Sequence, residues 1–334
     1  MKKKILWIAT GGTIASVASD NGLLPNISGE YMLEKSPELL KYCDIEVAEL
    51  FSLDSTNIQP EHWLKMANLI QEKYYQYDGF LLTHGTDTMA YTAAALTYLI
   101  QGNKPIVLTG SQRPLLDEYS DGKKNLLDSV RFLKEGISGV YIVFDGKAIL
   151  GSRARKVRSK SFAAFESINF PPIAYIDEDR VINYLNKEDK SEGISFYHNL
   201  NNKVFLLKLI PGIKPDILEY LSDHYDYIVI ESYGVGGIPF EDEANFLKQL
   251  KALTEKGKIV VLATQVMHEG SDALRYEVGR LAMSYNVLQA YDMTIEAVCA
   301  KLMWIGAYWH NYEDIKTQFY SRIANDIYPQ EEIN

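Results

Sequence analysis

Two threonines stand in short glycine-containing segments and could serve as nucleophiles. Thr13 lies in Thr10-Gly11-Gly12-Thr13-Ile14-Ala15-Ser16, and Thr86 lies in His84-Gly85-Thr86-Asp87-Thr88. A threonine hydroxyl attacks an electrophile only when a base takes its proton. The carboxylate of Asp87 follows Thr86 directly, so one of the two candidates has an ionisable neighbour.

A basic run supplies candidate bases, Arg153-Ala154-Arg155-Lys156-Val157-Arg158-Ser159-Lys160. Side chains alternate along a strand, so Lys156 would point away from Arg153 and Arg155 and could turn inward while both arginines stay solvated. A desolvated lysine can lose its proton near neutral pH and act as a base. The residues alone do not decide between Lys156 and Lys160, and the run could equally be a solvated basic face.

Both threonine segments follow predicted strands of a parallel sheet. Apolar runs at 4–9, 45–50, 80–83, 106–109 and 139–144 alternate with helical patterns at 60–77, 88–101 and 121–135. This alternation is typical of an α/β fold, in which ligands bind beyond the carboxyl ends of the strands. Hydroxyls, glycines and amides fill the turns that follow the first four strands, 10–16, 52–57, 84–88 and 110–114. These turns either cap helices or line one crevice for a small polar ligand with a carboxylate.

The length of 334 residues favours two domains, because single cores stop growing near ~250–300 residues. The second half repeats the alternation, with strands expected at 204–209, 227–230 and 259–263. Helices are expected there at 215–221, 241–256, 294–310 and 313–324. Polar sequence at 177–202 separates the halves. We therefore expect an N-terminal domain at 1–190, a linker at 191–211 and a smaller domain at 212–334.

Composition excludes several classes of function. A net charge of −10 disfavours nucleic acid or an anionic membrane as the main partner. No apolar run approaches the ~18 residues of a membrane span, and the N-terminal run ends at Thr10, too early for a secretory signal. We expect a cytoplasmic protein.

Metal and nucleotide motifs are missing from the sequence. Cys43 and Cys299 lie far apart and form no CxxC pair, and the six histidines show no HExxH spacing, so no metal is expected. The chain contains neither GxGxxG after the first strand nor GxxxxGK[ST], which disfavours a nucleotide. It also lacks the GxSxG of serine hydrolases.

Taken together, the polar segments resemble the bacterial-type L-asparaginases, and in particular the cytosolic type I group. The matching segments, in order along nearly the whole chain, are 10–15, 84–88, 109–114, 120–122, 232–236 and 292–297. The resemblance implies a larger N-terminal domain with a flavodoxin-like doubly wound sheet and a smaller Rossmann-like C-terminal α/β domain.

The resemblance also implies hydrolysis of L-asparagine to L-aspartate and ammonia, without a cofactor. By similarity, Thr13 is the nucleophile, and Thr86, Lys156 and Asp87 form a proton relay. Lys156 matches the family's lysine, five residues past Gly151. Main-chain N–H groups of the two threonine loops would stabilise the oxyanion.

Substrate contacts follow from the same similarity. Ser55 and Thr56 would hold the α-carboxylate of asparagine, and Asp87 its α-ammonium. Asparagine should be preferred to glutamine, although one methylene in a pocket is worth only ~1–3 kcal/mol.

The family completes each site with a residue of a neighbouring subunit, so a homodimer or homotetramer is implied. Glu269, Tyr276 and Glu277 are the candidates for that residue. Two positions depart from the family pattern. Leu23 stands where a lid tyrosine is common. Val266 follows Thr264-Gln265, where members activated by asparagine carry a cysteine, so that regulation is not expected.

Two other functions compete. One is the ammonia-producing subunit of a tRNA-dependent amidotransferase, a class with an additional N-terminal domain, whereas here the first strand begins at Lys4. The other is a non-catalytic asparagine-binding protein. Leu23 in place of the tyrosine is the only feature that favours it. The presence of Thr13, Thr86, Asp87 and Lys156 together argues against it, because binding alone needs neither a second threonine nor a lysine.

Overall fold

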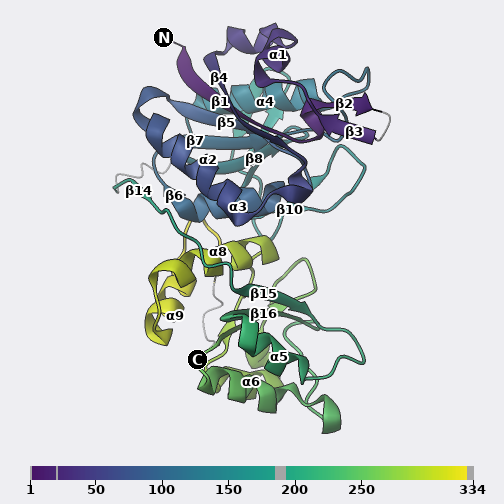
Figure 1. Cartoon of the computed structure of the whole chain (residues 1–334), viewed down its shortest axis with the longest axis vertical. Helices are drawn as coiled ribbons and strands as arrows, with labels where there is room; N and C mark the ends of the chain where they lie inside the picture. Colours follow the sequence, from purple (N-terminus) through teal and green to yellow (C-terminus); the bar gives the residue numbers. More distant parts are fainter. Residues whose placement is uncertain (1, 20–21, 185–192, 329–334) are drawn as a thin grey trace. The chain divides into compact units, whose positions relative to one another are not determined.

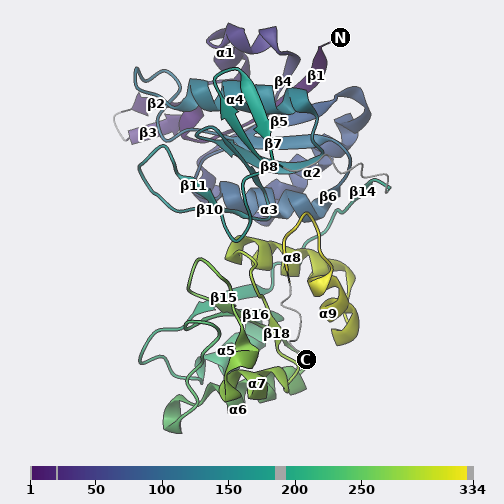
Figure 2. The ribbon, with the colours of Figure 1, turned by 180° about the vertical axis from the view of Figure 1, so that it is seen from behind.

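The computed structural model describes residues 2–19, 22–184 and 193–328. The chain divides into two compact units, Met1–His198 and Asn199–Asn334, both drawn in Figures 1 and 2. Residues 191 and 192, where the expected linker begins, lie outside the described residues. Within the described part, no helix is long and apolar enough to cross a membrane.

The N-terminal unit is built on an eight-stranded mixed sheet. Its parallel strands are β1 (Lys3–Gly11), β4 (Cys43–Leu53), β5 (Gly79–Thr83), β7 (Pro105–Thr109) and β8 (Gly139–Phe144). They lie side by side in the order β4-β1-β5-β7-β8. Numbered by their occurrence along the chain, this order is 2-1-3-4-5, that of flavodoxin-like doubly wound sheets. All five predicted strands of this half are present, and the predicted fold class is confirmed.

Three antiparallel strands extend this sheet and were not predicted. They are β9 (Lys147–Leu150), β12 (Ala174–Asp177) and β13 (Arg180–Asn183). β8 turns into β9 at Asp145-Gly146, where both residues have positive φ, 48° and 73°. Asp-Gly with two positive φ angles is typical of a two-residue hairpin turn. The sequence therefore contained a hairpin signal for β9, whereas β12 and β13 are too short for a clear pattern.

Helices cover both faces of the sheet (Figures 1 and 2). α2 (Pro60–Lys73) and α3 (Met89–Leu99) lie on one face and α4 (Gly122–Glu135) on the other. Leu126, Val130 and Leu133 of α4 pack in one core with inward side chains of β1, β5 and β7. The predicted helix at 88–101 ends earlier, because Ile100–Gln101 forms β6 and pairs with β14 (Ser195–Phe196).

The C-terminal unit has a smaller, four-stranded parallel sheet. Its strands β15 (Val204–Lys208), β16 (Tyr227–Ser232), β17 (Ile259–Thr264) and β18 (Leu288–Gln289) follow one another in chain order. Its helices are α5 (Ile217–His224), α6 (Phe246–Glu255), α7 (Glu277–Met283), α8 (Ile295–Tyr308) and α9 (Tyr312–Tyr320). α6 begins later than predicted because Asn245 accepts a hydrogen bond from Leu247 N and caps the helix there. β18 and α7 were not predicted.

Candidate active site

The four polar turns meet at the carboxyl end of the N-terminal sheet, backbone against backbone. A Cβ built on Gly12 would lie 2.3 Å from Gly85 N, and one on Gly85 would lie 2.6 Å from Ser55 Oγ. A Cβ on Gly110 would lie 2.3 Å from His84 O. Only glycine permits such approaches. The turns after β1, β4, β5 and β7 therefore form one cluster, at the point where the strand order of a doubly wound sheet reverses.

Thr13 begins the short helical turn η1 (Thr13–Ala15) directly after Gly12. Gly12 N donates to Leu53 O at 2.9 Å, and the residue has a φ of 80°. Thr13 follows Gly12 and Thr86 follows Gly85. Because the two glycines pack against each other, both threonines belong to the same cluster of turns. Thr13 itself is partly exposed.

A hairpin of β2 (Ser16–Ser19) and β3 (Gly22–Pro25) follows Thr13 and leads into α1 (Gly29–Glu34). Leu23 lies on β3 opposite Ala18, and its side chain lies outside the described part of the structure. Tyr31, the nearest tyrosine along the chain, lies on α1 with the Lys35 ammonium 5.0 Å from its ring centroid.

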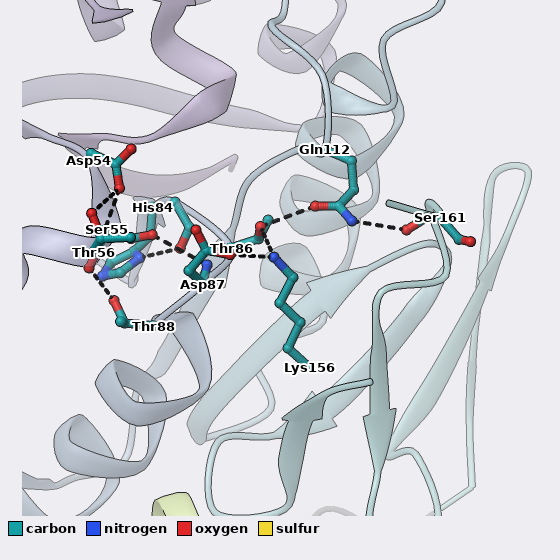
Figure 3. A network of polar contacts seen from close by, with 11 residues as sticks. Asp54, Ser55, Thr56, His84, Thr86, Asp87, Thr88, Gln112, Lys156 and Ser161 are labelled. Carbon is teal, nitrogen blue, oxygen red and sulfur yellow. Dashed lines mark hydrogen bonds and ion pairs between the residues drawn. The ribbon is translucent and has the colours of Figure 1, made fainter. Parts of the chain in front are cut away.

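Lys156 connects the second threonine to its acidic neighbour (Figure 3). Its Nζ donates to Thr86 Oγ1 at 2.7 Å and to Asp87 Oδ1 at 2.7 Å. The side chain of Lys156 is 17% exposed, and that of Asp87 is 57% exposed. Lys156 ends β10 (Ala154–Lys156), which pairs with β11 (Phe165–Ser167), while Lys160 is exposed in the following loop. The geometry therefore selects Lys156, not Lys160, as the lysine beside Thr86.

The expectation that both arginines of this run stay solvated is wrong for Arg153. Its side chain is fully buried, and its guanidinium lies 5.7 Å from the ring centroid of Phe170. Strand alternation failed here because Arg153 precedes β10 and lies in the turn after β9, where side chains do not alternate.

Ser55 and Thr56 belong to the turn η3 (Ser55–Asn57), which Asp54 caps. Ser55 is buried, and its Oγ accepts a hydrogen bond from Asp87 N at 3.3 Å. Both the N–H and the hydroxyl of Thr56 donate to Asp54 Oδ1 at 2.8 Å. The Thr56 hydroxyl must leave this carboxylate before it can donate elsewhere, whereas Ser55 can donate its proton without losing its bond to Asp87.

The sequence did not single out His84 as a support of the Thr86 loop. Gly85 O can only accept, so His84 Nδ1, which lies 2.7 Å from it, carries the proton of the neutral ring. The unprotonated Nε2 therefore accepts from the Thr92 hydroxyl at 2.9 Å, and Thr92 Oγ1 in turn accepts from Trp63 Nε1 at 2.9 Å. Burial lowers the pKa of His84 to about 4, so the ring is neutral at pH 7.

Gln112 and Asp121 were also not recognised individually. Thr86 Oγ1 donates to Gln112 Oε1 at 3.1 Å, and Gln112 N donates to both carboxylate oxygens of Asp121 at 3.0 Å. Burial raises the pKa of Asp121. Both residues stood in segments that carried the resemblance, but only their spatial position reveals the contacts.

The remaining predicted residues lie in the C-terminal unit. Glu269 has a φ of 75°, Tyr276 is exposed, and Glu277 begins α7. Among the described residues, no group of three histidine, cysteine or acidic side chains is arranged to hold a metal ion. Cys43 and Cys299 are both buried as free thiols.

The fold is a doubly wound sheet, and two threonine loops and a lysine meet at its carboxyl edge. This combination indicates an enzyme of the α/β class, and sequence comparison identifies the family. Residues 4–189 match the asparaginase N-terminal domain, and residues 203–319 match the glutaminase/asparaginase C-terminal domain. The chain belongs to the asparaginase family.

Individual relatives are similar over nearly the whole of this chain. An L-asparaginase of Thermococcus kodakarensis is 38% identical, covering 97% of this chain and 99% of that protein. L-asparaginase 1 of Escherichia coli K12 is 32% identical, over 99% and 100%. A component of the glutamyl-tRNA(Gln) amidotransferase of Methanosphaera stadtmanae is 34% identical, over 94% of this chain and 74% of that protein.

Solved structures agree with the fold. The thermostable L-asparaginase of Thermococcus kodakarensis superimposes with a TM-score of 0.91 at 37% identity, covering 98% of this chain and 99% of that one. L-asparaginase I of Vibrio cholerae superimposes with a TM-score of 0.89 at 30% identity, covering 98% and 100%.

Proposed function

We propose that the protein is a cytoplasmic L-asparaginase, which hydrolyses L-asparagine to L-aspartate and ammonia. The observation that carries the proposal is the bridge from Lys156 to Thr86 and Asp87 at 2.7 Å each, beside the loop that bears Thr13. The names of full-length relatives and of a probable cytoplasmic L-asparaginase from Campylobacter jejuni support the activity and the compartment.

Thr13 is the nucleophile in the proposed reaction. Its Oγ attacks the side-chain amide carbon, and N–H groups of the two threonine loops stabilise the oxyanion. The C–N bond then breaks, and the leaving nitrogen takes the Thr86 proton and departs as ammonia. Lys156 replaces that proton on Thr86. Water hydrolyses the resulting ester and restores Thr13.

Substrate is held by the neighbouring turn. The buried Ser55 hydroxyl donates to the α-carboxylate, and Thr56 joins it after leaving Asp54. Asp87 is more than half exposed, so its carboxylate can bind the α-ammonium while one oxygen keeps Lys156. With its α-carboxylate and its α-ammonium both bound, the substrate is held with its side-chain amide toward the threonines.

Ammonia release by the purified protein tests the proposal, with L-asparagine and L-glutamine assayed in parallel. We expect rapid turnover of asparagine, weak turnover of glutamine, and loss of at least about 100-fold in Thr13→Ala. Wild-type rates in Thr13→Ala would remove Thr13 as the nucleophile. A folded protein that binds asparagine but releases no ammonia would be a binding protein instead.

A homodimer or homotetramer is part of the proposal, with Glu269, Tyr276 or Glu277 of a second copy completing each site. Sedimentation analysis gives the assembly size. Thr13→Ala is co-expressed in turn with an inactivating variant of Glu269, of Tyr276 and of Glu277, for example Glu277→Gln. Partial activity should return only with the variant of the residue that acts on the neighbouring subunit's site. Strict monomers with full activity would contradict this part.

The amidotransferase reading keeps one specific support, the similarity to components of the glutamyl-tRNA(Gln) amidotransferases. It predicts that ammonia release is slow alone and rises when a tRNA-charging partner and glutamyl-tRNA are added. Full turnover of free asparagine without either addition would exclude it.

A further inference from the structure

The side chains of Lys156, Thr86 and Gln112 form a chain of hydrogen bonds with a fixed direction, which ends on a main-chain oxygen (Figure 3). The Lys156 ammonium can only donate, so Thr86 Oγ1 accepts from it at 2.7 Å. The single hydroxyl proton of Thr86 is then left for Gln112 Oε1 at 3.1 Å. The amide end of Gln112 donates to the main-chain oxygen of Ser161 at 3.1 Å. Because that oxygen can only accept, the amide of Gln112 cannot be turned around.

The backbone beneath Gln112 is fixed by a buried carboxylate. Asp121 accepts from Gln112 N and from Arg113 N, and Asn125 Nδ2 donates to its Oδ2 at 3.1 Å. The Arg113 guanidinium lies 5.8 Å from the ring centroid of Phe162, next to Ser161. Gln112 is therefore held both through its main chain and through the neighbouring loop, which leaves its side-chain oxygen little freedom.

We propose that Gln112 is a positioning residue that holds the Thr86 hydroxyl proton on the side away from Lys156, from which the leaving amide nitrogen takes it. While Thr86 Oγ1 accepts from the Lys156 ammonium, its own proton can still rotate about the Cβ–Oγ1 bond. A second acceptor, on the side away from Lys156, is needed to fix the direction of that proton. Gln112 Oε1 is that acceptor. The inference rests on the proposed asparaginase activity, and Gln112 acts through Thr86 without itself exchanging protons.

The protons balance in the step that Gln112 serves. When the C–N bond breaks, its electron pair stays on nitrogen, which takes the proton from Thr86 Oγ1 and leaves as ammonia. Thr86 takes a proton from the Lys156 ammonium. Lys156 regains one from solvent, to which Thr13 releases its own proton during attack. The net change is transfer of the Thr13 proton to ammonia.

The test compares two leaving groups. The amide nitrogen must take a proton to leave as ammonia, whereas the less basic hydroxylamine leaving group depends less on a proton donor. Rates are measured with L-asparagine and with L-aspartic acid β-hydroxamate for the wild type, Gln112→Met and Gln112→Glu. Methionine fills the space without an acceptor. Glutamate keeps an acceptor for Thr86 and loses the donor to Ser161. Gln76→Met, on the exposed turn before β5 at the opposite end of the sheet, is the matched control.

We expect Gln112→Met to lower kcat for asparagine about tenfold more than kcat for the hydroxamate, with KM for both nearly unchanged. Gln112→Glu should restore the wild-type ratio of the two rates, and Gln76→Met should change neither. If Gln112→Met does not fold, Gln112→Asn, which withdraws the acceptor by one methylene, must give the same discrimination.

Two results would overturn the inference alone. One is an equal loss of kcat for asparagine and for the hydroxamate in Gln112→Met. The other is a ratio of the two rates in Gln112→Glu that departs from the wild-type ratio as far as it does in Gln112→Met. The second would mean that the bond to Ser161, not the bond to Thr86, is what matters. A wild-type protein inert toward asparagine removes the proposed function and this inference together, so the two failures are distinguishable.

Discussion

At the scale of single residues, the site depends on one lysine shared by two acceptors. Lys156 is mostly buried and donates to both Thr86 and Asp87, so Lys156→Met removes the proposed proton donor to Thr86 and leaves Asp87 without its cation. We expect asparagine turnover to fall at least about 100-fold while the fold is kept. Lys160→Met, an exposed lysine of the same run, is the control and should retain wild-type turnover. Equal losses in both variants would mean that the basic run acts only through its overall charge.

His84 should make the stability of the protein depend on pH. Its pKa is lowered from 6.5 to about 4 by burial, so the unfolded chain binds more protons than the folded one between these pH values. The free energy of unfolding therefore falls as pH drops from 6.5 to 4, by about 3 kcal/mol if the ring is forced to remain neutral. Urea unfolding at pH 7, 5.5 and 4.5 measures the slope.

His84→Gln is the comparison for this slope, since an amide does not titrate in this range. The variant should be less stable at pH 7, because it loses the Thr92 and Gly85 contacts, but its stability should change less with pH. Carboxyls such as Asp121, whose pKa is raised, act in the opposite sense and cancel in the difference between the two proteins. Parallel slopes would show that His84 is accessible to protons in the folded state.

At the scale of elements, the turns need glycine where they touch. Gly85→Ala places a Cβ 2.6 Å from Ser55 Oγ and 2.7 Å from its Cβ, at a residue without positive φ, so the effect is purely steric. We expect a loss of about 1–3 kcal/mol in stability and a larger relative loss of activity, since Ser55 and Thr86 are pushed apart. Gly193→Ala meets no atom within 4 Å and is the control. Unaltered activity in Gly85→Ala would show that the loops can separate without cost.

The sequence predicted all of the parallel strands except β18, and most of the helices, because their apolar runs are long and are bounded by capping residues. It missed β12, β13, β18 and α7, which are short segments whose place is set by tertiary contacts rather than by periodicity. At the site, residue types and spacing led to Thr13 and Thr86 and left Lys156 and Lys160 equal. Lys156, on the hairpin of β10 and β11, meets Thr86 through a contact between residues 70 positions apart in the sequence, which no local pattern reveals. The contacts of Gln112 with Thr86 and Ser161 also join separate segments of the chain, and no local pattern marks them.

At the scale of the whole molecule, each unit has its own core, and the C-terminal one includes a fully buried ion pair. Lys301 on α8 donates to Asp326 Oδ2 at 2.7 Å and to Ser321 O at 2.7 Å, and both charged side chains are 0% exposed. Burial lowers the pKa of Lys301, and Asp326 opposes that effect. The pair joins the segment after α9 to α8, so it ties residues near the C-terminus to the sheet of this unit.

Asp326→Asn should therefore loosen the C-terminal unit specifically. The variant leaves the Lys301 ammonium buried without its counter-charge, which costs about 3–5 kcal/mol. Hydrogen exchange followed by mass spectrometry should show faster exchange in peptides from α8 to residue 328, with the sheet of β1, β4 and β5 unchanged. Asp223→Asn, an exposed acid on α5 of the same unit, controls for the lost charge. Exchange that accelerates equally in both units would mean that the two cores unfold as one cooperative body. The predicted local effect requires instead that the C-terminal unit can open on its own.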